Sequence, residues 1–466
     1  MLSQIVLFIN ILFSGWLFAR DRKLNPMPSR ASWIALLWIL ILGSRYVSAW
    51  FGVDTDMVSP DELLEGSPLD RNIFLVLMSA GAVELFLRRP EWGRIFSSNR
   101  WFFAFFLYCG LSIFWSDYPF VSFKRYVKEI GNIIMVLIIL TEKDPVQATR
   151  AVFARYIHLV IPLSIILIYC YPELGIYFDD DGIPSYCGVA TNKNKLGVIS
   201  FVSGLFLVWE LIHRGGTEGK EIDWSKVLSC GALLALVAWL IFIAHSATAL
   251  VCIVVGTLIL FLMKFSFVVE HLRYLGLYSM VLAISMIVIL YYFPTAINAI
   301  AEGVGRDRTF TGRTDLWLDL LREPINPLVG TGYQSFWLGS RADYLWDKYL
   351  FHPIQAHNGY LETYLNGGFV GVALLLAMIV ATGNKLKKVL LLERSFAILL
   401  IVFIITAILY NMTEAMISRL SLLWFVICIA ALYSPMEPKV VAAIDKSTAA
   451  RGTRLNNRKV RTLPGH

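Results

Sequence analysis

Charged residues are scarce in this sequence. Only 16% of its 466 residues are charged and 57% are hydrophobic, whereas a soluble domain carries roughly 25% charged residues. Apolar runs of about 17 to 22 residues recur, which is the length that crosses about 30 Å of hydrocarbon. The runs are continuous rather than alternating, which disfavours a transmembrane β-barrel. The composition therefore predicts an all-α, polytopic membrane protein with about 12–13 transmembrane helices.

The cysteines carry no metal signature. There are six of them, but no CxxC pair and no Cys/His cluster, so zinc binding is not predicted. Cys170 and Cys187 flank one predicted outer loop, where we favour free thiols over a disulfide. The others lie in apolar runs and are interpreted as small apolar side chains: Cys109, Cys230, Cys252 and Cys428.

The basic excess does not point to nucleic acid. The net charge is +7, but much of it lies in short loops and in the tail from Lys439 to Arg461, as expected of segments kept on the cytoplasmic side of a membrane. No nucleic-acid partner is predicted. The first apolar run has no basic segment before it and no cleavage signal after it, so residues 2–19 are predicted to be an uncleaved span.

Thirteen apolar segments are predicted to span the bilayer, and Lys and Arg in alternate loops orient them with the N-terminus outside and the C-terminus inside. The chain then divides into residues 1–293 with ten spans, a large outer loop at 294–358, three last spans within 359–433 and a basic tail at 434–466. The predicted spans are 2–19, 31–50, 72–88, 101–115, 127–141, 154–171, 196–213, 227–245, 247–263, 273–293, 359–381, 395–411 and 415–433.

The outer loop at 294–358 is too long for a simple connector, which marks it as a functional segment with structure of its own. Within it, Thr309 to Arg322 places Leu316, Leu320 and Leu321 at helical spacing. Glu323 precedes a proline and should end this helix.

Several cations break the charge rule by lying on the predicted outer side. A charge inside a span is costly and suggests function, and Arg45 and Arg419 both lie in predicted spans. Together the outer cations predict a basic pocket for a phosphate or pyrophosphate. The alternative is contact with lipid headgroups or acidic side chains. The other members are Lys124, Arg125, Lys128, Lys193, Lys195, Arg306, Arg308, Arg313 and Arg341.

His357 is the candidate acid–base residue, because an imidazole titrates near about pH 6.5 and can take a proton from a sugar hydroxyl. If a helix begins at about Asn358, the positive end of its dipole disfavours the imidazolium and keeps the base free. His352 is an alternative base. Glu362 is interpreted either as a partner of His357 or as the ion-pair partner of a cation. The glycines that follow suggest close helix packing.

The residues around His357, with two stretches before them, resemble a known protein family. His357-Asn358, nine residues, Gly368, two residues and Gly371 resemble the signature of the O-antigen ligase and Wzy-type polysaccharide polymerase superfamily. Gly312–Trp317 and Gly330–Tyr333 are similar to the outer loop of that family. The resemblance extends over roughly residues 100–430. Two further stretches resemble in particular the exopolysaccharide polymerases of the succinoglycan type: Phe114–Asp117 with Ser122 and Arg125, and Thr191–Gly197.

The resemblance implies a glycosyl transfer at the outer face of the bacterial inner membrane, where a sugar hydroxyl attacks a polyprenyl-pyrophosphate-linked glycan. His357 would be the base and Arg313 a pyrophosphate ligand. Related ligases carry a further arginine, which the stretch His245–Ala249 lacks. Lys193, Lys195 and Arg125 are the predicted replacements, and Arg45 and Asn358 complete the predicted substrate-binding set. No metal and no cofactor is expected. The predicted partners are the lipid-linked oligosaccharide, the bilayer and a chain-length regulator.

Three other functions stay open. A ligase would move the glycan to a lipid A core or a protein by the same chemistry. A metal-dependent glycosyltransferase would use Asp54 and Asp56 for a divalent ion, although a solvated acidic loop is the favoured interpretation there. A transporter or flippase would also need polar groups within spans, but it has less need of a structured outer loop with a histidine at a helix start.

Overall fold

The computed structural model describes residues 2–24, 28–52, 67–178, 182, 184–214, 224–265, 309–349 and 351–435, with a few single positions between 268 and 285. Throughout these ranges the regular structure is helical apart from one antiparallel pair of short strands, β1 (Ile176–Phe178) and β2 (Pro184–Tyr186). The all-α prediction is confirmed. The acidic loop around Asp54 and Asp56, the predicted outer cations Arg306 and Arg308, and most of the predicted span 273–293 lie outside the described residues.

Helices make up most of the described residues. Five helices are long and apolar enough to cross a membrane by length and composition: α1 (Leu2–Leu24), α9 (Pro145–Cys170), α11 (Lys193–Arg214), α12 (Trp224–Ala244) and α19 (Gly359–Leu392). Shorter apolar helices accompany them: α2 (Ser32–Leu42), α7 (Arg100–Leu111) continuing into η1 (Ser112–Trp115), α13 (Ala247–Leu262), α20 (Arg394–Tyr410) and α21 (Leu422–Leu432). The remaining helices are α3 (Val47–Trp50), α5 (Pro68–Arg88), α6 (Trp92–Ser98), α8 (Pro119–Leu140), α10 (Pro172–Gly175), α17 (Thr309–Arg322) and α18 (Gly339–Lys348).

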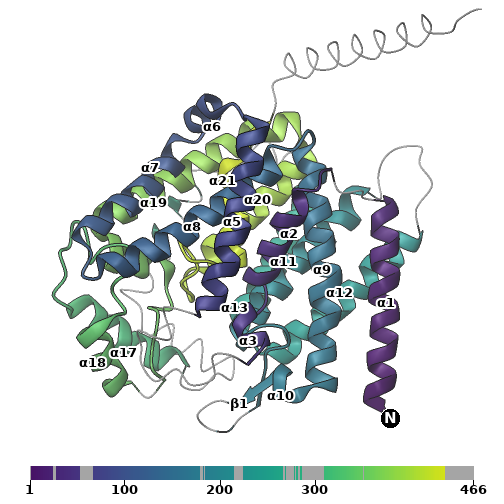
Figure 1. Cartoon of the computed structure of the whole chain (residues 1–466), viewed down its shortest axis with the longest axis horizontal. Helices are drawn as coiled ribbons and strands as arrows, with labels where there is room; N and C mark the ends of the chain where they lie inside the picture. The colour runs from purple at the N-terminus through teal and green to yellow at the C-terminus, as the bar shows by residue number, and fades with distance from the viewer. Residues whose placement is uncertain are drawn as a thin grey trace, which may run out of the picture.

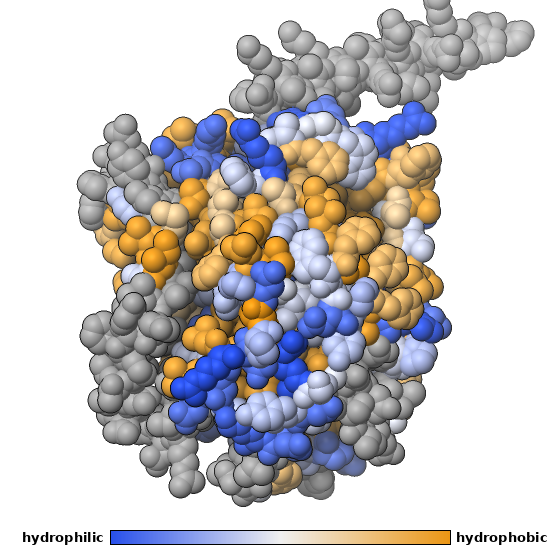
Figure 2. Space-filling view, turned by 90° about the vertical axis from the view of Figure 1, so that its left-hand side faces the viewer, coloured by the Kyte–Doolittle hydropathy of each residue, from blue (hydrophilic) through white to orange (hydrophobic). Residues whose placement is uncertain are grey.

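The helices form a bundle whose core is α20 and α21, both of them buried along most of their length. α1 lies at one edge, where it packs on α9 (Figure 1). α17 and α18 sit at one end of the bundle, away from α6 (Figure 1). In Figure 2, apolar side chains cover much of the middle of one face, and polar ones gather toward the end that carries α17 and α18. This division matches a membrane-embedded body with one polar end.

The described part of residues 294–358 has its own small core, as the length of this segment suggested. Leu316 and Leu320 of α17 are buried together with Phe336, Trp337 and Leu345. The helix predicted at Thr309 to Arg322 is confirmed. Because the indole of Trp317 donates to the carbonyl of Ala356 at 2.6 Å, this core is tied directly to the residue before His357.

The predicted last span, 415–433, is wrong at its start, because α21 begins only at Leu422. Residues 411–421 form a loop in which backbone turns run as far as Glu414, and side-chain hydrogen bonds hold the part that follows. The amide oxygen of Asn411 accepts from the backbone of Met416 at 2.8 Å and of Ile417 at 3.2 Å, and Ser421 caps α21. We call residues 411–421 the α20–α21 loop.

α19 is longer than the predicted span 359–381 and is broken at Gly368. This glycine has φ 59°, ψ −164°, and a Cβ there would lie 2.2 Å from the carbonyl carbon of Leu328. The loop before α18 docks at the break, where Phe369 donates to the carbonyl of Pro327 at 2.8 Å. Gly368 therefore makes a turn that a larger residue could not make, rather than a contact between straight helices.

Candidate active site

His357 lies at the start of α19, where the chain turns sharply. Its φ is 48°, and the next residue, Asn358, caps the helix by accepting from the backbone of Tyr360 at 3.0 Å and Leu361 at 3.1 Å. The predicted helix start is confirmed, and it gives the Asn358 side-chain oxygen a capping role. Asn358 was predicted to bind substrate, and no contact in the described residues tests that role.

Several polar residues around His357 contact the same buried carboxylate. Glu414, in the α20–α21 loop, is 2% exposed. One of its oxygens lies 3.2 Å from Nδ1 of His357 and accepts from Gln355 at 3.1 Å. The other accepts from Asn194 at 2.7 Å and lies 3.2 Å from a guanidinium nitrogen of Arg313. Residues from three separate parts of the sequence thus meet on one side chain.

The charge of Glu414 sets the tautomer of His357. Burial acts to raise the pKa of Glu414, but hydrogen bonding from His357 and the charges of His357 and Arg313 outweigh it, so the pKa lies below its ordinary value. An ionised carboxylate can only accept hydrogen bonds. Nδ1 of His357 therefore carries a proton, so that in the neutral imidazole the lone pair lies on Nε2, where it can act as a base. The His357 side chain is 20% exposed, which leaves it accessible.

Acidification is expected to weaken this cluster. Because the pKa of Glu414 lies below its ordinary value of 4.5, its carboxylate contributes stability that is present above about pH 4.5 and is lost as the pH falls through the lowered pKa. We expect wild type to melt at a higher temperature than Glu414→Gln at neutral pH, and the gap to close on titration toward about pH 3. A gap that stays constant over this range would show that Glu414 is not held as a carboxylate.

Arg313 is fixed on the same loop by two contacts. One nitrogen of its guanidinium donates to the carbonyl of Thr413 at 2.8 Å and another faces Glu414. Its side chain remains 22% exposed, and a guanidinium has five N–H donors, so others are left for a ligand. The structure therefore brings the two residues carried by the family motif, His357 and Arg313, to a shared partner.

The start of α11 borders this cluster. Lys193 and Lys195 flank Asn194, whose amide contacts Glu414. The ammonium group of Lys195 lies 5.7 Å from the centre of the Tyr46 ring. The start of α13 borders it as well, because the hydroxyl oxygens of Thr248 and Thr413 are 2.7 Å apart. His245–Ala249, the stretch that lacks the arginine of the related ligases, therefore also lies beside the Glu414 cluster.

Two cations that were predicted to bind substrate, Arg45 and Arg125, contact backbone carbonyls rather than Glu414. The guanidinium of Arg45 donates to the carbonyl oxygens of Ala190 at 2.9 Å and Gly188 at 3.1 Å, and it also contacts Leu174. It holds the loop before α11 in place. Arg125 donates to the carbonyl of Gln334. These contacts give both arginines a role in supporting the loops near the site.

The sequence predicted Glu362 either as a partner of His357 or as the ion-pair partner of a cation, and in the structure it pairs with a cation. It accepts from Arg419 at 2.6 Å, from the Trp337 indole at 3.0 Å and from the backbone of Ala356 at 2.9 Å. Arg419 lies in the α20–α21 loop rather than inside a helix. The Glu362–Arg419 pair therefore fixes both the residue before His357 and the loop that carries Glu414.

Sequence reasoning missed Glu414, the centre of the cluster. Its one signal was an acid at the edge of a long apolar run, which is a functional hypothesis by default in a membrane protein. His352, the alternative base, has its ring 4.9 Å from that of Trp346. Among the described residues, no three His, Cys, Asp or Glu side chains are grouped so as to hold a metal ion.

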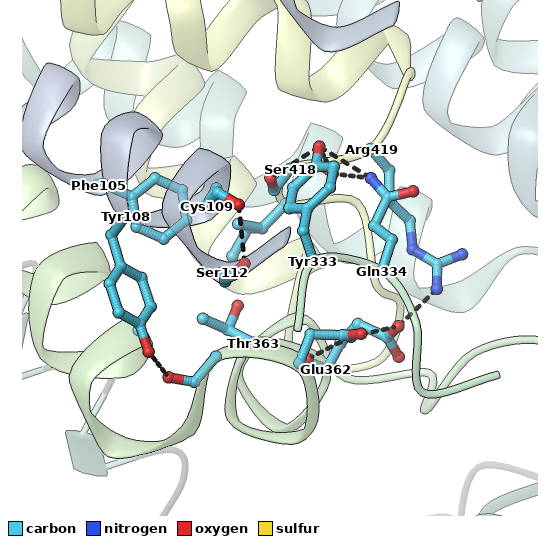
Figure 3. Close-up of a pocket in the computed structure, with 14 residues that line it drawn as sticks. Phe105, Tyr108, Cys109, Ser112, Tyr333, Gln334, Glu362, Thr363, Ser418 and Arg419 are labelled. Carbon is cyan, nitrogen blue, oxygen red and sulfur yellow. Dashed lines mark hydrogen bonds and ion pairs between the residues drawn. The ribbon is translucent and has the colours of Figure 1, made fainter. Parts of the chain in front are cut away.

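A pocket adjoins the cluster between α7 and the first turns of α19 (Figure 3). Its empty volume is about 440 Å³, part of it open to solvent. α7 contributes Phe105, Tyr108 and Cys109, and α19 contributes Gly367 and Gly371. The polar end of the pocket is formed by Glu362 and Arg419 together with Tyr333, Gln334 and Ser418.

Comparison with known proteins identifies a family domain in this chain. The sequence profile described as O-Antigen ligase matches residues 232–376. The chain carries a domain of the O-antigen ligase family. The domain includes Thr248, Arg313 and His357, whereas Glu414 lies beyond it. The Exopolysaccharide production protein ExoQ of Rhizobium meliloti (strain 1021) is 27% identical over 311 residues, which are 63% of this chain and 67% of that relative. With its membrane-length helices and this domain, the chain is a bacterial membrane protein.

Proposed function

We propose that the protein transfers a glycan from a polyprenyl-pyrophosphate carrier to a sugar hydroxyl, and so polymerises exopolysaccharide repeat units. The observation that carries this proposal is the buried carboxylate of Glu414, which holds His357 and Arg313 side by side. A base for the attacking hydroxyl and a cation for the leaving group are the two elements that such a transfer needs.

The proposed reaction is a single displacement. Nε2 of His357 takes the proton of the acceptor hydroxyl while its oxygen attacks the anomeric carbon. The bond from that carbon to the pyrophosphate oxygen breaks, and its electron pair leaves with the polyprenyl pyrophosphate. Arg313, with Lys193 and Lys195, stabilises the charge of the leaving group. One displacement without an enzyme nucleophile inverts the anomeric centre. No metal ion or cofactor takes part in this mechanism, so EDTA should leave the rate unchanged.

A polymerase and a ligase differ in the acceptor to which the glycan is transferred. The matched profile is described as O-Antigen ligase, which favours transfer to a lipid A core or a protein. The similar relative is a protein of exopolysaccharide production, which favours transfer to another repeat unit. We place the reaction at the outer face of the inner membrane, with residues 294–358 in the periplasm, the C-terminus in the cytoplasm and a separate protein regulating chain length.

Mass analysis of lipid-linked and secreted glycans tests this proposal in cells with and without the protein. Loss of a polymerase should leave single repeat units on the lipid at the outer leaflet. Loss of a ligase should leave long chains on the lipid, and loss of a flippase should leave single units inside. Either of the last two patterns would overturn the polymerase assignment.

Arg313→Lys is expected to lose activity although it keeps the charge. Lysine offers a point charge where arginine offers several N–H groups in a planar fork. Losing one charge-assisted hydrogen bond costs about 1.5–3 kcal/mol, or roughly 10-fold to 100-fold in rate. Polymer formed per inserted protein is the measurement.

Arg322→Lys is the matched control, because Arg322 lies on the same helix and also pairs with an acid, Asp319, at 3.8 Å, but not with Glu414. Its activity should stay near that of wild type. Equal activities of the two variants would assign Arg313 to structure alone.

A further inference from the structure

A second and larger cavity, which we call the α9–α20 cavity, lies at the other end of the bundle from the proposed active site. Its empty volume is about 1100 Å³, part of it open to solvent. The starts of α9 and α20, the residues that follow α21 and one side of α11 enclose it. The α20–α21 loop joins the opposite ends of α20 and α21, where it contacts Arg313 of α17. Because α20 has 17 residues, about 25 Å of helix separates the cavity from that loop.

Three cations border the α9–α20 cavity. Lys143 and Arg394 are exposed, and within the part of the chain that the structure describes neither of them pairs with an acid. Arg150 is held in place by the carboxylate of Glu210 and by Trp209, whose ring centre lies 4.8 Å from the guanidinium carbon. The charges of Lys143 and Arg394 are therefore available to an anion.

Acids also lie at the α9–α20 cavity, and each of them accepts hydrogen bonds from the protein. Asp144 caps α9 by accepting from a backbone N–H at 2.9 Å, and Glu393 accepts from the hydroxyl of Tyr433. Glu210 is shared between Arg150 and Lys226. Four cations thus face three acids, and the positive ends of two helix dipoles add to the excess of positive charge.

Two serine hydroxyls at the α9–α20 cavity lack a hydrogen-bond partner. Ser395 and Ser434 both border the cavity, and their buried Oγ atoms make no hydrogen bond within the described residues. A buried hydroxyl without a partner is costly. An oxyanion in the cavity gives both hydroxyls an acceptor and pairs with the cations at the same time.

Apolar side chains exposed beside Arg394 indicate which molecule supplies this oxyanion. Leu391 and Leu392, at the end of α19, are 85% and 53% exposed, and Phe261 of α13 is 48% exposed. Arg394 reaches the end of α13, where it donates to the carbonyl of Met263 at 3.3 Å. In a membrane protein such side chains are covered by lipid tails, and basic pockets between spanning helices suit lipid head groups. A phospholipid therefore fits better than a free anion.

We propose that the α9–α20 cavity binds the phosphodiester head group of an anionic phospholipid. The phosphate lies between Lys143 and Arg394, and the hydroxyls of Ser395 and Ser434 donate to its oxygens. The acyl chains follow α13 and the end of α19. On the topology proposed above, this lipid belongs to the cytoplasmic leaflet. The site is separate from the proposed reaction, so its test needs no glycan.

The test is a titration of the delipidated full-length protein with phosphatidylglycerol, in which native mass spectrometry counts the bound lipid. Lys143→Gln combined with Arg394→Gln should bind roughly 30-fold more weakly than wild type, because each cation near an anionic lipid contributes about fivefold. Lys143→Arg combined with Arg394→Lys keeps both charges and should bind as wild type does.

Lys387→Gln combined with Lys388→Gln is the matched control. It also removes two exposed lysine charges close to the end of α19, but outside the cavity, and it should bind phosphatidylglycerol as wild type does. The lipid should also raise the unfolding temperature of wild type and of this control, because a ligand that binds the folded state stabilises it. The variant that lacks the charges of Lys143 and Arg394 should show no such rise.

Four results would overturn the lipid site. Unchanged binding without the charges of Lys143 and Arg394 would place the lipid elsewhere, and an equal loss in the Lys387 and Lys388 control would assign it to diffuse surface charge. Equal binding of phosphatidylethanolamine would show that the cavity does not select an anionic lipid. Competition by free glycerol 1-phosphate would assign the cavity to a soluble anion instead.

Discussion

Replacement of His357 by alanine is expected to lower the rate of polymer formation by about 10²- to 10⁴-fold, the range typical of a lost general base. Alanine leaves the acceptor hydroxyl without a proton acceptor, whereas Glu414 keeps Arg313 in place. The measurement is polymer formed per membrane-inserted protein, with insertion checked by membrane fractionation.

His352→Ala is the matched control for this variant. His352 lies in the same segment and also has a positive φ, 43° against 48° for His357, so both substitutions remove an imidazole from a similar backbone. Its ring packs near Trp346 rather than on Glu414, and the variant should keep near-normal activity. If His352→Ala is the inactive protein and His357→Ala makes polymer, the base has been assigned to the wrong histidine.

Glu414→Gln should have the second largest effect. Glutamine keeps the size of the side chain but removes the charge that sets the His357 tautomer and pairs with Arg313. Loss of an orienting group costs 10-fold to 100-fold in many sites and about 10⁴-fold where a carboxylate fixes a catalytic histidine, so a loss of roughly 10²-fold or more is expected. Rates per folded protein provide the measurement.

A double variant shows whether Glu414 acts through His357. If it does, His357→Ala combined with Glu414→Gln should be about as slow as His357→Ala alone, because the two residues act as a unit. Glu84→Gln is the control, since Glu84 also accepts from an arginine, Arg88, at 2.7 Å, but on α5. Fully additive losses would place Glu414 in a separate role.

The membrane helices were predictable because their signal is local. A continuous apolar run long enough to cross the bilayer leaves the backbone few alternatives to a helix, and the positions of α9, α11, α12 and α20 follow from it. The α20–α21 loop breaks the rule. The apolar residues between Ala415 and Leu420 suggested the start of a span, but the shape of this stretch depends on the Asn411 side chain, whose oxygen accepts from the backbone of Met416 and Ile417. The apolar pattern of the sequence does not reveal where side-chain hydrogen bonds take the place of helical ones.

The active site was predictable only in part. The spacing of His357 and Gly368 carries a motif, and the motif links His357 to Arg313. Glu414 has no motif, and its partners come from positions 194, 313, 355 and 357. Only the tertiary fold brings these together. For Arg45, the cost of a cation near a span predicted a ligand-binding role, and no feature of the sequence indicated the contacts that its guanidinium makes with backbone carbonyls.

The central claim is that this protein itself joins lipid-linked repeat units with His357 as the base. The most direct test uses purified protein in lipid vesicles with lipid-linked single repeat units and EDTA, and follows glycan mass and released polyprenyl pyrophosphate by mass spectrometry. The predicted result is glycans at whole multiples of the repeat mass, with one carrier released for each new linkage, and almost none with His357→Ala. Equal polymer from His357→Ala, or movement of single units across the membrane without any new linkage, would contradict it.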